Sequence, residues 1–169
     1  VPKKIKFQYV TGEIHHVFGR AYPLQVCLGS RDDVVVSADG ELQLVLRTKQ
    51  REREKVFKAG MKRILLGEIE KQLEIWTKRM AIPESRITGV TIRVMKSRWG
   101  SCRRVTGRFS FALDLVTKPK ECIEAVVVHE LCHLFAAGHG PDFYARMETY
   151  LPDYKERDRL LASLPRELV

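Results

Sequence analysis

The spacing of hydrophobic positions in the first 46 residues predicts strands. Apolar side chains alternate with polar ones over residues 5–9, and further short apolar runs follow at 16–18 and 22–28. Alternation at every second residue is typical of strands with one buried face. The clearest hairpin lies at 34–46, where an Ala-Asp-Gly turn separates two apolar runs. We therefore expect residues 1–46 to form a small antiparallel sheet.

From Thr48 to Met80 the hydrophobic spacing becomes three to four residues. The side chains that repeat in this way are Phe57, Met61, Leu65, Ile69, Leu73, Trp76 and Met80. This spacing predicts one long amphipathic helix, with Thr48 as its N-cap and Pro83 beyond its end.

A second strand pair is expected at 90–94 and 109–113, because apolar residues alternate again in both segments. The residues between them, 96–102, are expected to interrupt the pair. This stretch and the turn after it place Trp99 and Gly100 among Arg98, Arg103 and Arg104. An aromatic residue and a glycine among arginines indicate a surface that a ligand backbone or a phosphate approaches closely.

The stretch VVVHELCHLFAAGH at 126–139 carries the most informative chemistry. It places His129 and His133 four residues apart around Glu130. On a helix this spacing puts both imidazoles on one face, where they can reach one metal ion. Glu130 then lies about 100° around the helix from His129, beside the ion. We expect the histidines to hold Zn²⁺ and Glu130 to act as general base toward a metal-activated water.

The residues after this motif supply a third ligand. The helix is expected to begin near Thr117, and Gly138 is suited to the positive φ that reverses a chain after a helix. Such a reversal would bring His139 back to the same ion. Three protein ligands leave one position open for water, which is typical of a catalytic rather than a structural zinc site. Two more helices are expected at 143–150 and 155–164.

The net charge of +9 is concentrated in the middle of the chain. Residues 47–108 carry 18 basic and 6 acidic side chains, and this excess favours an anionic partner, including nucleic acid. No apolar run is long enough for a membrane span, and the polar start does not resemble a secretory signal. Four cysteines without a close pair are typical of a reducing compartment, so the cytoplasm is the expected location.

Several motifs resemble the YgjP-like metallopeptidase-domain family, which is related to the SprT-like zincins. They are MKSRWGSC at 95–102, VVVHELCHL at 126–134, the 139–143 stretch and YLPDYKER at 150–157. The resemblance implies a minimal zinc-peptidase fold in which His129, His133 and His139 bind zinc and Glu130 is the catalytic acid/base. It also implies a second activity credited to the family, the hydrolysis of nucleoside triphosphates, UTP in particular, with release of pyrophosphate.

Together these patterns predict a single α+β domain. It would comprise an N-terminal β-rich region (1–46) and a minimal zincin-type core (47–169) with a long helix, a small antiparallel sheet and the HExxH helix. The preferred hypothesis is a zinc-dependent hydrolase with one Zn²⁺ ion that cleaves peptide bonds. An extended peptide would pair with the strand that leads into Arg98, Trp99 and Gly100. Tyr144 or Tyr150 would help to stabilise the oxyanion.

Two alternatives remain open. In the first, the protein hydrolyses UTP, and Arg98, Arg103 and Arg104 bind the phosphates, because an activated water attacks phosphorus as well as a carbonyl carbon. The absence of a P-loop and of clustered carboxylates from the sequence weighs against nucleotide chemistry. In the second, the protein is a nucleic-acid-associated zinc protein that contacts phosphates through residues 47–108.

Overall fold

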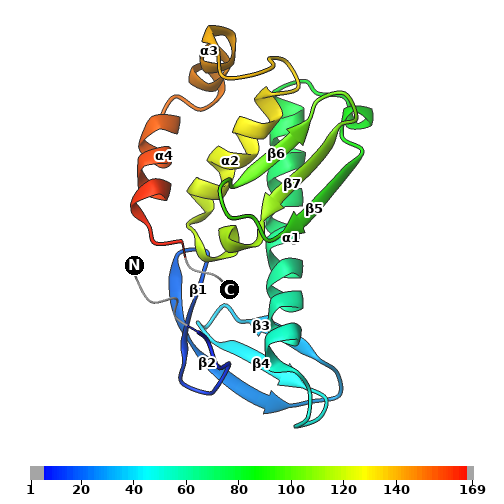
Figure 1. Ribbon diagram of the computed structural model, residues 1–169, viewed down its shortest axis with the longest axis vertical. Helices are drawn as coiled ribbons and strands as arrows, with labels where there is room; N and C mark the ends of the chain where they lie inside the picture. Colours follow the sequence, from blue (N-terminus) through cyan, green and yellow to red (C-terminus); the bar gives the residue numbers. More distant parts are fainter. Residues whose placement is uncertain (1–5, 167–169) are drawn as a thin grey trace.

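The computed structural model describes residues 6–166 as an α+β fold, with two small sheets and four α-helices in that range (Figure 1). The elements in chain order are β1 (Ile14–Val17), β2 (Arg20–Leu28), β3 (Asp33–Val36), β4 (Leu42–Leu46), α1 (Arg53–Arg79), the 3-10 helix η1 (Glu84–Arg86), β5 (Gly89–Arg93), β6 (Gly100–Arg103), β7 (Arg108–Ala112), the 3-10 helix η2 (Leu113–Thr117), α2 (Lys120–Cys132), α3 (Pro141–Tyr150) and α4 (Tyr154–Ser163).

Both sheets are mixed, so the prediction of antiparallel sheets is wrong in this respect. The N-terminal sheet has the order β1-β2-β4-β3, and β2 runs parallel to β4. The second sheet has the order β5-β7-β6, with β5 parallel and β6 antiparallel to β7. The segment expected to interrupt the second strand pair therefore ends in a strand, β6, which forms one edge of this sheet. The predicted hairpin of β3 and β4 is confirmed.

Helix α1 confirms the long amphipathic helix and packs against both sheets (Figure 1). All seven apolar residues that predicted it are buried. Its start differs from the prediction, because the N-cap is Glu52 and not Thr48. Asp32 explains this shift: its carboxylate accepts hydrogen bonds from the backbone N–H of Arg47 and from the Arg51 side chain, which hold the preceding residues in a loop.

The strand predicted at 5–9 is absent from residues 6–9, and Ile5 lies outside the described residues. Tyr9 has a positive φ of 56°, which is incompatible with a strand. Its backbone N–H donates to Glu13, and its ring stacks on His15, which is 3% exposed. This segment therefore folds over the N-terminal sheet as an aromatic cluster that also includes Phe57 of α1.

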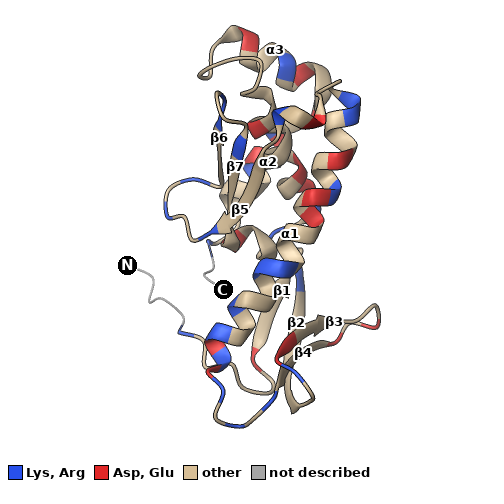
Figure 2. Cartoon of the chain, turned by 90° about the vertical axis from the view of Figure 1, so that its right-hand side faces the viewer, with Lys and Arg blue, Asp and Glu red and all other residues tan. Residues whose placement is uncertain are grey.

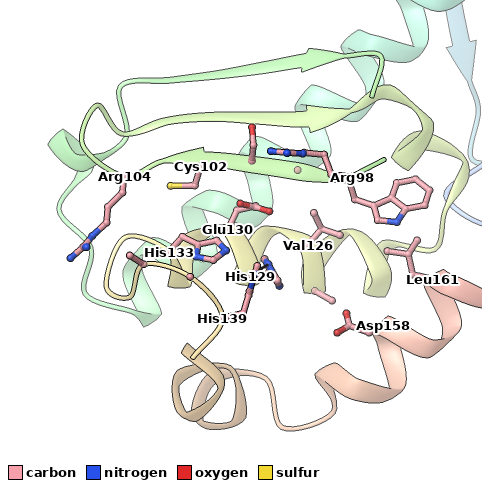
Figure 3. Close-up of a pocket in the computed structure, with 16 residues that line it drawn as sticks. Arg98, Cys102, Arg104, Val126, His129, Glu130, His133, His139, Asp158 and Leu161 are labelled. Atoms are coloured by element: carbon pink, nitrogen blue, oxygen red, sulfur yellow. Dashed lines mark hydrogen bonds between the residues drawn. The ribbon is translucent and has the colours of Figure 1, made fainter. Parts of the chain in front are cut away.

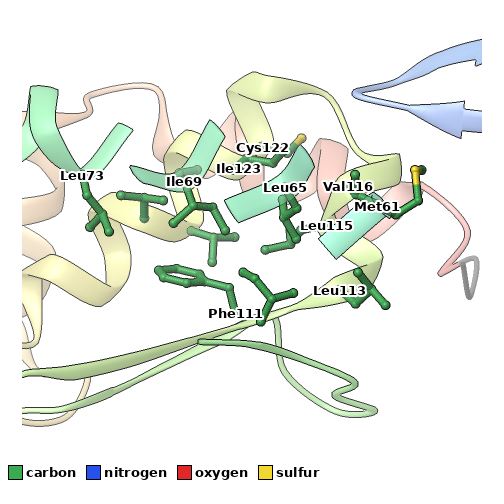
Figure 4. Packing of buried hydrophobic residues seen from close by; sticks show 14 of the residues in the cluster. Met61, Leu65, Ile69, Leu73, Phe111, Leu113, Leu115, Val116, Cys122 and Ile123 are labelled. Carbon is green, nitrogen blue, oxygen red and sulfur yellow. The ribbon is translucent and has the colours of Figure 1, made fainter. Parts of the chain in front are cut away.

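Helix α2 lies between α1, α4 and the second sheet, and its apolar residues fill the core beneath that sheet (Figure 4). A polar network also fixes its position. Trp76 of α1 donates its indole N–H to the Glu124 carboxylate of α2 at 2.9 Å, and Arg157 of α4 donates to the same carboxylate at 2.7 Å. Because three helices share one carboxylate, α2 is held rigidly where it carries the histidines.

Among the described helices, none combines the length and the apolar character needed to cross a membrane. The basic residues of the middle segment are spread along α1 and over the strands of the second sheet (Figure 2).

Candidate active site

The three predicted metal ligands meet at the C-terminal end of α2. His129 lies in its last turn, His133 caps it and His139 follows in the loop before α3. Their nearest ring nitrogens lie within 4.8 Å of one another, and the two Nε2 atoms of His129 and His139 are 3.0 Å apart. Tetrahedral zinc with bonds of about 2.1 Å requires nitrogens roughly 3.4 Å apart, so small movements of the side chains would bring these imidazoles around one zinc ion.

The loop that returns His139 is longer than a simple helix cap. Helix α2 ends at Cys132, so Gly138 is not the residue directly after the helix. Gly138 nevertheless has the expected positive φ, 71°, and it precedes His139 in the loop. The predicted role of this glycine in turning the chain is therefore confirmed, although its position relative to the helix differs.

Two contacts orient the imidazoles. The Nδ1 atom of His133 lies 3.2 Å from the carbonyl oxygen of Ala136, which favours the tautomer that donates from Nδ1 and leaves Nε2 free to bind an ion. Phe143, which is 1% exposed, packs against all three rings with centroid distances of 4.7, 4.7 and 4.9 Å to His129, His133 and His139. The aromatic ring of Phe143 thus supports all three metal-ligand side chains from one side.

Burial adjusts the proton affinities at this site. Desolvation, together with the neighbouring imidazoles of His133 and His139, lowers the pKa of His129 to about 4. Desolvation also lowers the pKa of His133. Both rings are therefore neutral near pH 7, which is the form that binds a metal. Desolvation raises the pKa of Glu130 to about 7, and the positive charge of Arg98 opposes part of this rise.

A cleft of about 620 Å³ surrounds these groups (Figure 3). Its floor is α2, its upper rim is β6 with the segment before it, and α4 forms part of the opposite wall. Strand β6 passes close over Glu130, because a Cβ atom on Gly100 would lie 3.0 Å from the Glu130 Cγ. Gly100 thus allows β6 to lie close to Glu130, and the close approach of a ligand to this glycine stays a prediction. The free edge of β6 borders the cleft.

The predicted substrate-binding residues divide into two groups. Arg98, Trp99, Gly100 and Arg104 line the cleft with the histidines. Arg103 does not, and instead lies in a separate depression beside Arg93 and Arg108. Successive side chains of a strand point to opposite faces, so the neighbouring positions along this segment cannot all face the same site.

Neither predicted tyrosine lines the cleft. Tyr144 is 45% exposed, and its ring centroid lies 6.5 Å from that of His139. Tyr150 packs against the hydrophobic core at the end of α3. The position of Tyr150 gives no support to a role in stabilising an oxyanion, and Tyr144 lies beside the ligand set without bordering the cleft.

The cleft also contains residues that the sequence analysis did not single out. Asp158 and Leu161 of α4 and Cys102 of β6 belong to its lining. Phe143 was likewise missed, although an aromatic residue in the first turn after the third histidine is a signal that the sequence offered. The residues of α4 lie far from the motif in the sequence, so no local pattern connects them with it.

The rim segment before β6 is held by Arg166, near the end of the described residues. Its guanidinium donates to the carbonyl oxygens of Met95 at 2.5 Å and Arg98 at 2.8 Å. The same group lies 4.0 Å from the centroid of the Trp99 ring and pairs with the buried Asp114 at 3.3 Å. The C-terminal segment therefore fixes the backbone that presents Arg98 and Trp99.

Comparison with known proteins agrees with this architecture. Two solved structures share the fold, each with a TM-score of 0.50: the metallopeptidase zymogens abylysin of Pyrococcus abyssi and jannalysin of Methanocaldococcus jannaschii. Abylysin is 23% identical over 60% of this chain and 99% of its own, and jannalysin is 21% identical over 58% and 91%. No curated protein matches the chain in sequence. The family model of the YgjP-like metallopeptidase domain matches residues 2–164. The chain therefore belongs to the YgjP-like metallopeptidase-domain family.

Proposed function

We propose that this protein is a zinc-dependent peptidase with Glu130 as its general base and His129, His133 and His139 as its metal ligands. The observation that carries this proposal is the convergence of three imidazoles and one buried carboxylate in a single cleft (Figure 3). Membership of a metallopeptidase family supports it independently.

The metal ligands and Glu130 have separate roles in peptide hydrolysis. A zinc ion held by the three imidazoles would polarise a water molecule and the scissile carbonyl. Glu130 takes the proton from the attacking water and passes it to the leaving amine. Desolvation raises the pKa of this carboxyl group to about 7, and the charge of a bound zinc ion would favour the ionised form that a general base requires.

Strand β6 provides a way to bind the peptide. Its free edge borders the cleft directly above Glu130. An extended peptide that adds to this edge forms backbone hydrogen bonds, which do not depend on the peptide sequence. Such pairing places a peptide bond over Glu130 and the histidines, and the side chains of the peptide then reach the walls of the cleft.

Metal analysis combined with peptide hydrolysis tests the proposal. The purified protein should contain one zinc ion per chain and cleave a subset of a fluorogenic peptide library. Glu130→Gln should retain the zinc and lose roughly 10³-fold or more in rate, because it keeps the shape of the side chain but cannot accept the proton. Substoichiometric zinc in protein that cleaves peptides, or unchanged hydrolysis by Glu130→Gln, would contradict the proposal.

Hydrolysis of UTP is a second candidate, favoured by the position of Arg98 and Arg104 in the same cleft as the histidines. Two guanidinium groups there suit a triphosphate. The test is release of pyrophosphate from UTP by wild type and by His129→Ala. Activity that survives this substitution would show that the pyrophosphate comes from another enzyme in the preparation.

We further propose the cytoplasm as the location. All four cysteines are free thiols in the structure, as expected for a protein of a reducing compartment. Detection of a disulfide in protein isolated from its native cells would contradict this assignment.

A further inference from the structure

Asp158 occupies an unusual position on α4. The residues one turn before and one turn after it on the same face of the helix, Tyr154 and Leu161, are both buried, with 5% of each side chain exposed. An apolar side chain would continue this stripe. Instead the stripe is interrupted by Asp158, an exposed residue whose carboxylate forms part of the wall of the active-site cleft (Figure 3).

No cation within residues 6–166 pairs with this carboxylate. The adjacent Arg157 is engaged elsewhere, since it binds Glu124 and Asp153. Arg98, which lines the same cleft, acts on Glu130, and no basic group contributes to the shift of the Asp158 pKa. Desolvation alone raises that pKa above its usual value. The carboxylate therefore lines the cleft without an ion-pair partner among residues 6–166, and it remains accessible from solvent.

The walls near Asp158 are apolar. Val126 of α2 and Leu161 of α4 lie on the same side of the cleft as Asp158 (Figure 3). Ala125 and Trp99 also belong to the lining, and Arg166 lies over one face of the Trp99 ring. A space with apolar sides and one carboxylate matches a side chain that has a hydrocarbon stem and a cationic head. Lysine and arginine have this construction.

This end of the cleft lies next to the reacting groups. Ala125 and Val126 precede His129 by about one helical turn, which corresponds to roughly 5 Å along α2. A substrate residue bound there would be within one or two positions of the bond over Glu130, given a rise of about 3.3 Å per residue in an extended peptide. Arg104 lies toward the opposite end of the cleft (Figure 3), so it does not compete for the same side chain.

We infer that Asp158, with Trp99, Val126 and Leu161, forms a subsite that binds a lysine or arginine side chain of the substrate. The inference rests on the proposed peptidase function for its biological meaning, but it concerns binding and can be tested without hydrolysis. It predicts that substrates carry a basic residue within two positions of the cleaved bond.

The binding test uses the zinc-loaded Glu130→Gln protein and two sets of acetylated, amidated alanine hexapeptides. One set carries a single lysine at each position in turn, and the other carries norleucine, which has a similar stem without the charge. Affinity is measured by the quenching of tryptophan fluorescence. The best lysine peptide should bind roughly 10-fold more tightly than its norleucine counterpart, because only the lysine ammonium can pair with the carboxylate while the cleft holds the rest of the peptide.

A second substitution assigns this preference to Asp158. Adding Asp158→Asn should abolish the difference between lysine and norleucine. Adding Glu156→Gln should preserve it, because this change removes one negative charge from another exposed position of the same helix that does not line the cleft. The inference is overturned if the lysine peptides bind no better than the norleucine peptides, or if the preference survives Asp158→Asn.

Hydrolysis assays on wild type separate this inference from the proposed function. A lysine preference in binding without cleavage of any peptide would leave the subsite intact and remove the peptidase proposal. Cleavage without any preference for a basic residue would support the peptidase proposal and remove the subsite.

Discussion

Replacing Gly100 with alanine should slow hydrolysis about 10-fold without loss of the metal. The added methyl carbon would lie 3.0 Å from the Cγ atom of Glu130, 3.2 Å from its Oε1 atom and 3.2 Å from the Cγ1 atom of Val126. Carbon atoms normally approach to about 3.5–4.0 Å, so at least half an ångström must be recovered by movement. The Val126 side chain is buried and packed in the hydrophobic core, whereas the Glu130 side chain can rotate.

The carboxylate of Glu130 therefore moves by roughly half an ångström in Gly100→Ala. Because a misplacement of about 1 Å can cost 10²-fold in rate, we expect a loss of about 10-fold, equivalent to about 1.4 kcal/mol in the activation free energy. The atoms nearest to the added methyl group belong to Glu130 and Val126 and not to a histidine, so the zinc content should stay at one ion per chain.

The assay compares kcat on a cleaved peptide with zinc content for wild type, Gly100→Ala and Gly89→Ala. Gly89 begins β5 of the same sheet, and a Cβ atom there would meet no atom within 4 Å, so this control should behave like wild type. Full activity in Gly100→Ala would refute the account of Glu130 given above. Loss of zinc would show that the strand supports the metal ligands rather than the base.

Three further predictions concern other parts of the molecule. Phe143→Ala should weaken zinc binding, measured by metal competition, and lower the free energy of unfolding by about 3–5 kcal/mol, measured by urea unfolding. Phe143→Leu should restore most of the zinc affinity and of the stability. Unchanged zinc affinity in Phe143→Ala would contradict the role of the ring as a support for the ligands. Burial raises the pKa of Glu13, but hydrogen bonds from the Gln8 backbone and from His15 have the larger combined effect and bring it below 4.5. Its contribution to stability is thus present above pH 4.5 and lost as the pH falls through the lower folded value, so Glu13→Gln should reduce the acid sensitivity of the melting temperature, and an identical pH profile would refute this. Finally, if the basic residues at 47–108 bind nucleic acid, DNA affinity should fall steeply between 50 and 200 mM salt, on the order of 10³-fold or more for six phosphate contacts; a flat response would dismiss this alternative.

The local elements of the fold were readable from the sequence because their signals lie within one segment. The spacing of Phe57, Met61 and Leu65 and its continuation fixed α1, since only a helix places such residues on one face. The pairing of strands was not readable in the same way. Whether β2 pairs with β4 or β5 with β7 depends on contacts between distant segments, and alternation within one strand carries no information on its neighbour.

The same distinction applies to the site. The three histidines and Glu130 follow one another within a short stretch. Helical geometry predicts that His129 and His133 meet beside Glu130, and the reversal expected at Gly138 adds His139. Strand β6 was missed because Gly-Ser-Cys-Arg has no apolar alternation, and without the strand the separation of Arg103 from the cleft could not be predicted. Asp158 belongs to a different helix, α4, and only the packing of α4 against α2 brings it to the cleft.

The short span of the ligand set has a consequence for folding. His129 and His139 are only ten residues apart, so closing the loop between them costs little conformational entropy even in the unfolded chain. A zinc ion would therefore retain measurable affinity for the denatured protein, and binding to both states reduces the stabilisation that the ion gives to the folded one. We expect zinc to raise the melting temperature less than its affinity for the native protein alone would suggest. Its larger effect should be on the loop from Leu134 to Gly140, where amide hydrogen exchange should slow most.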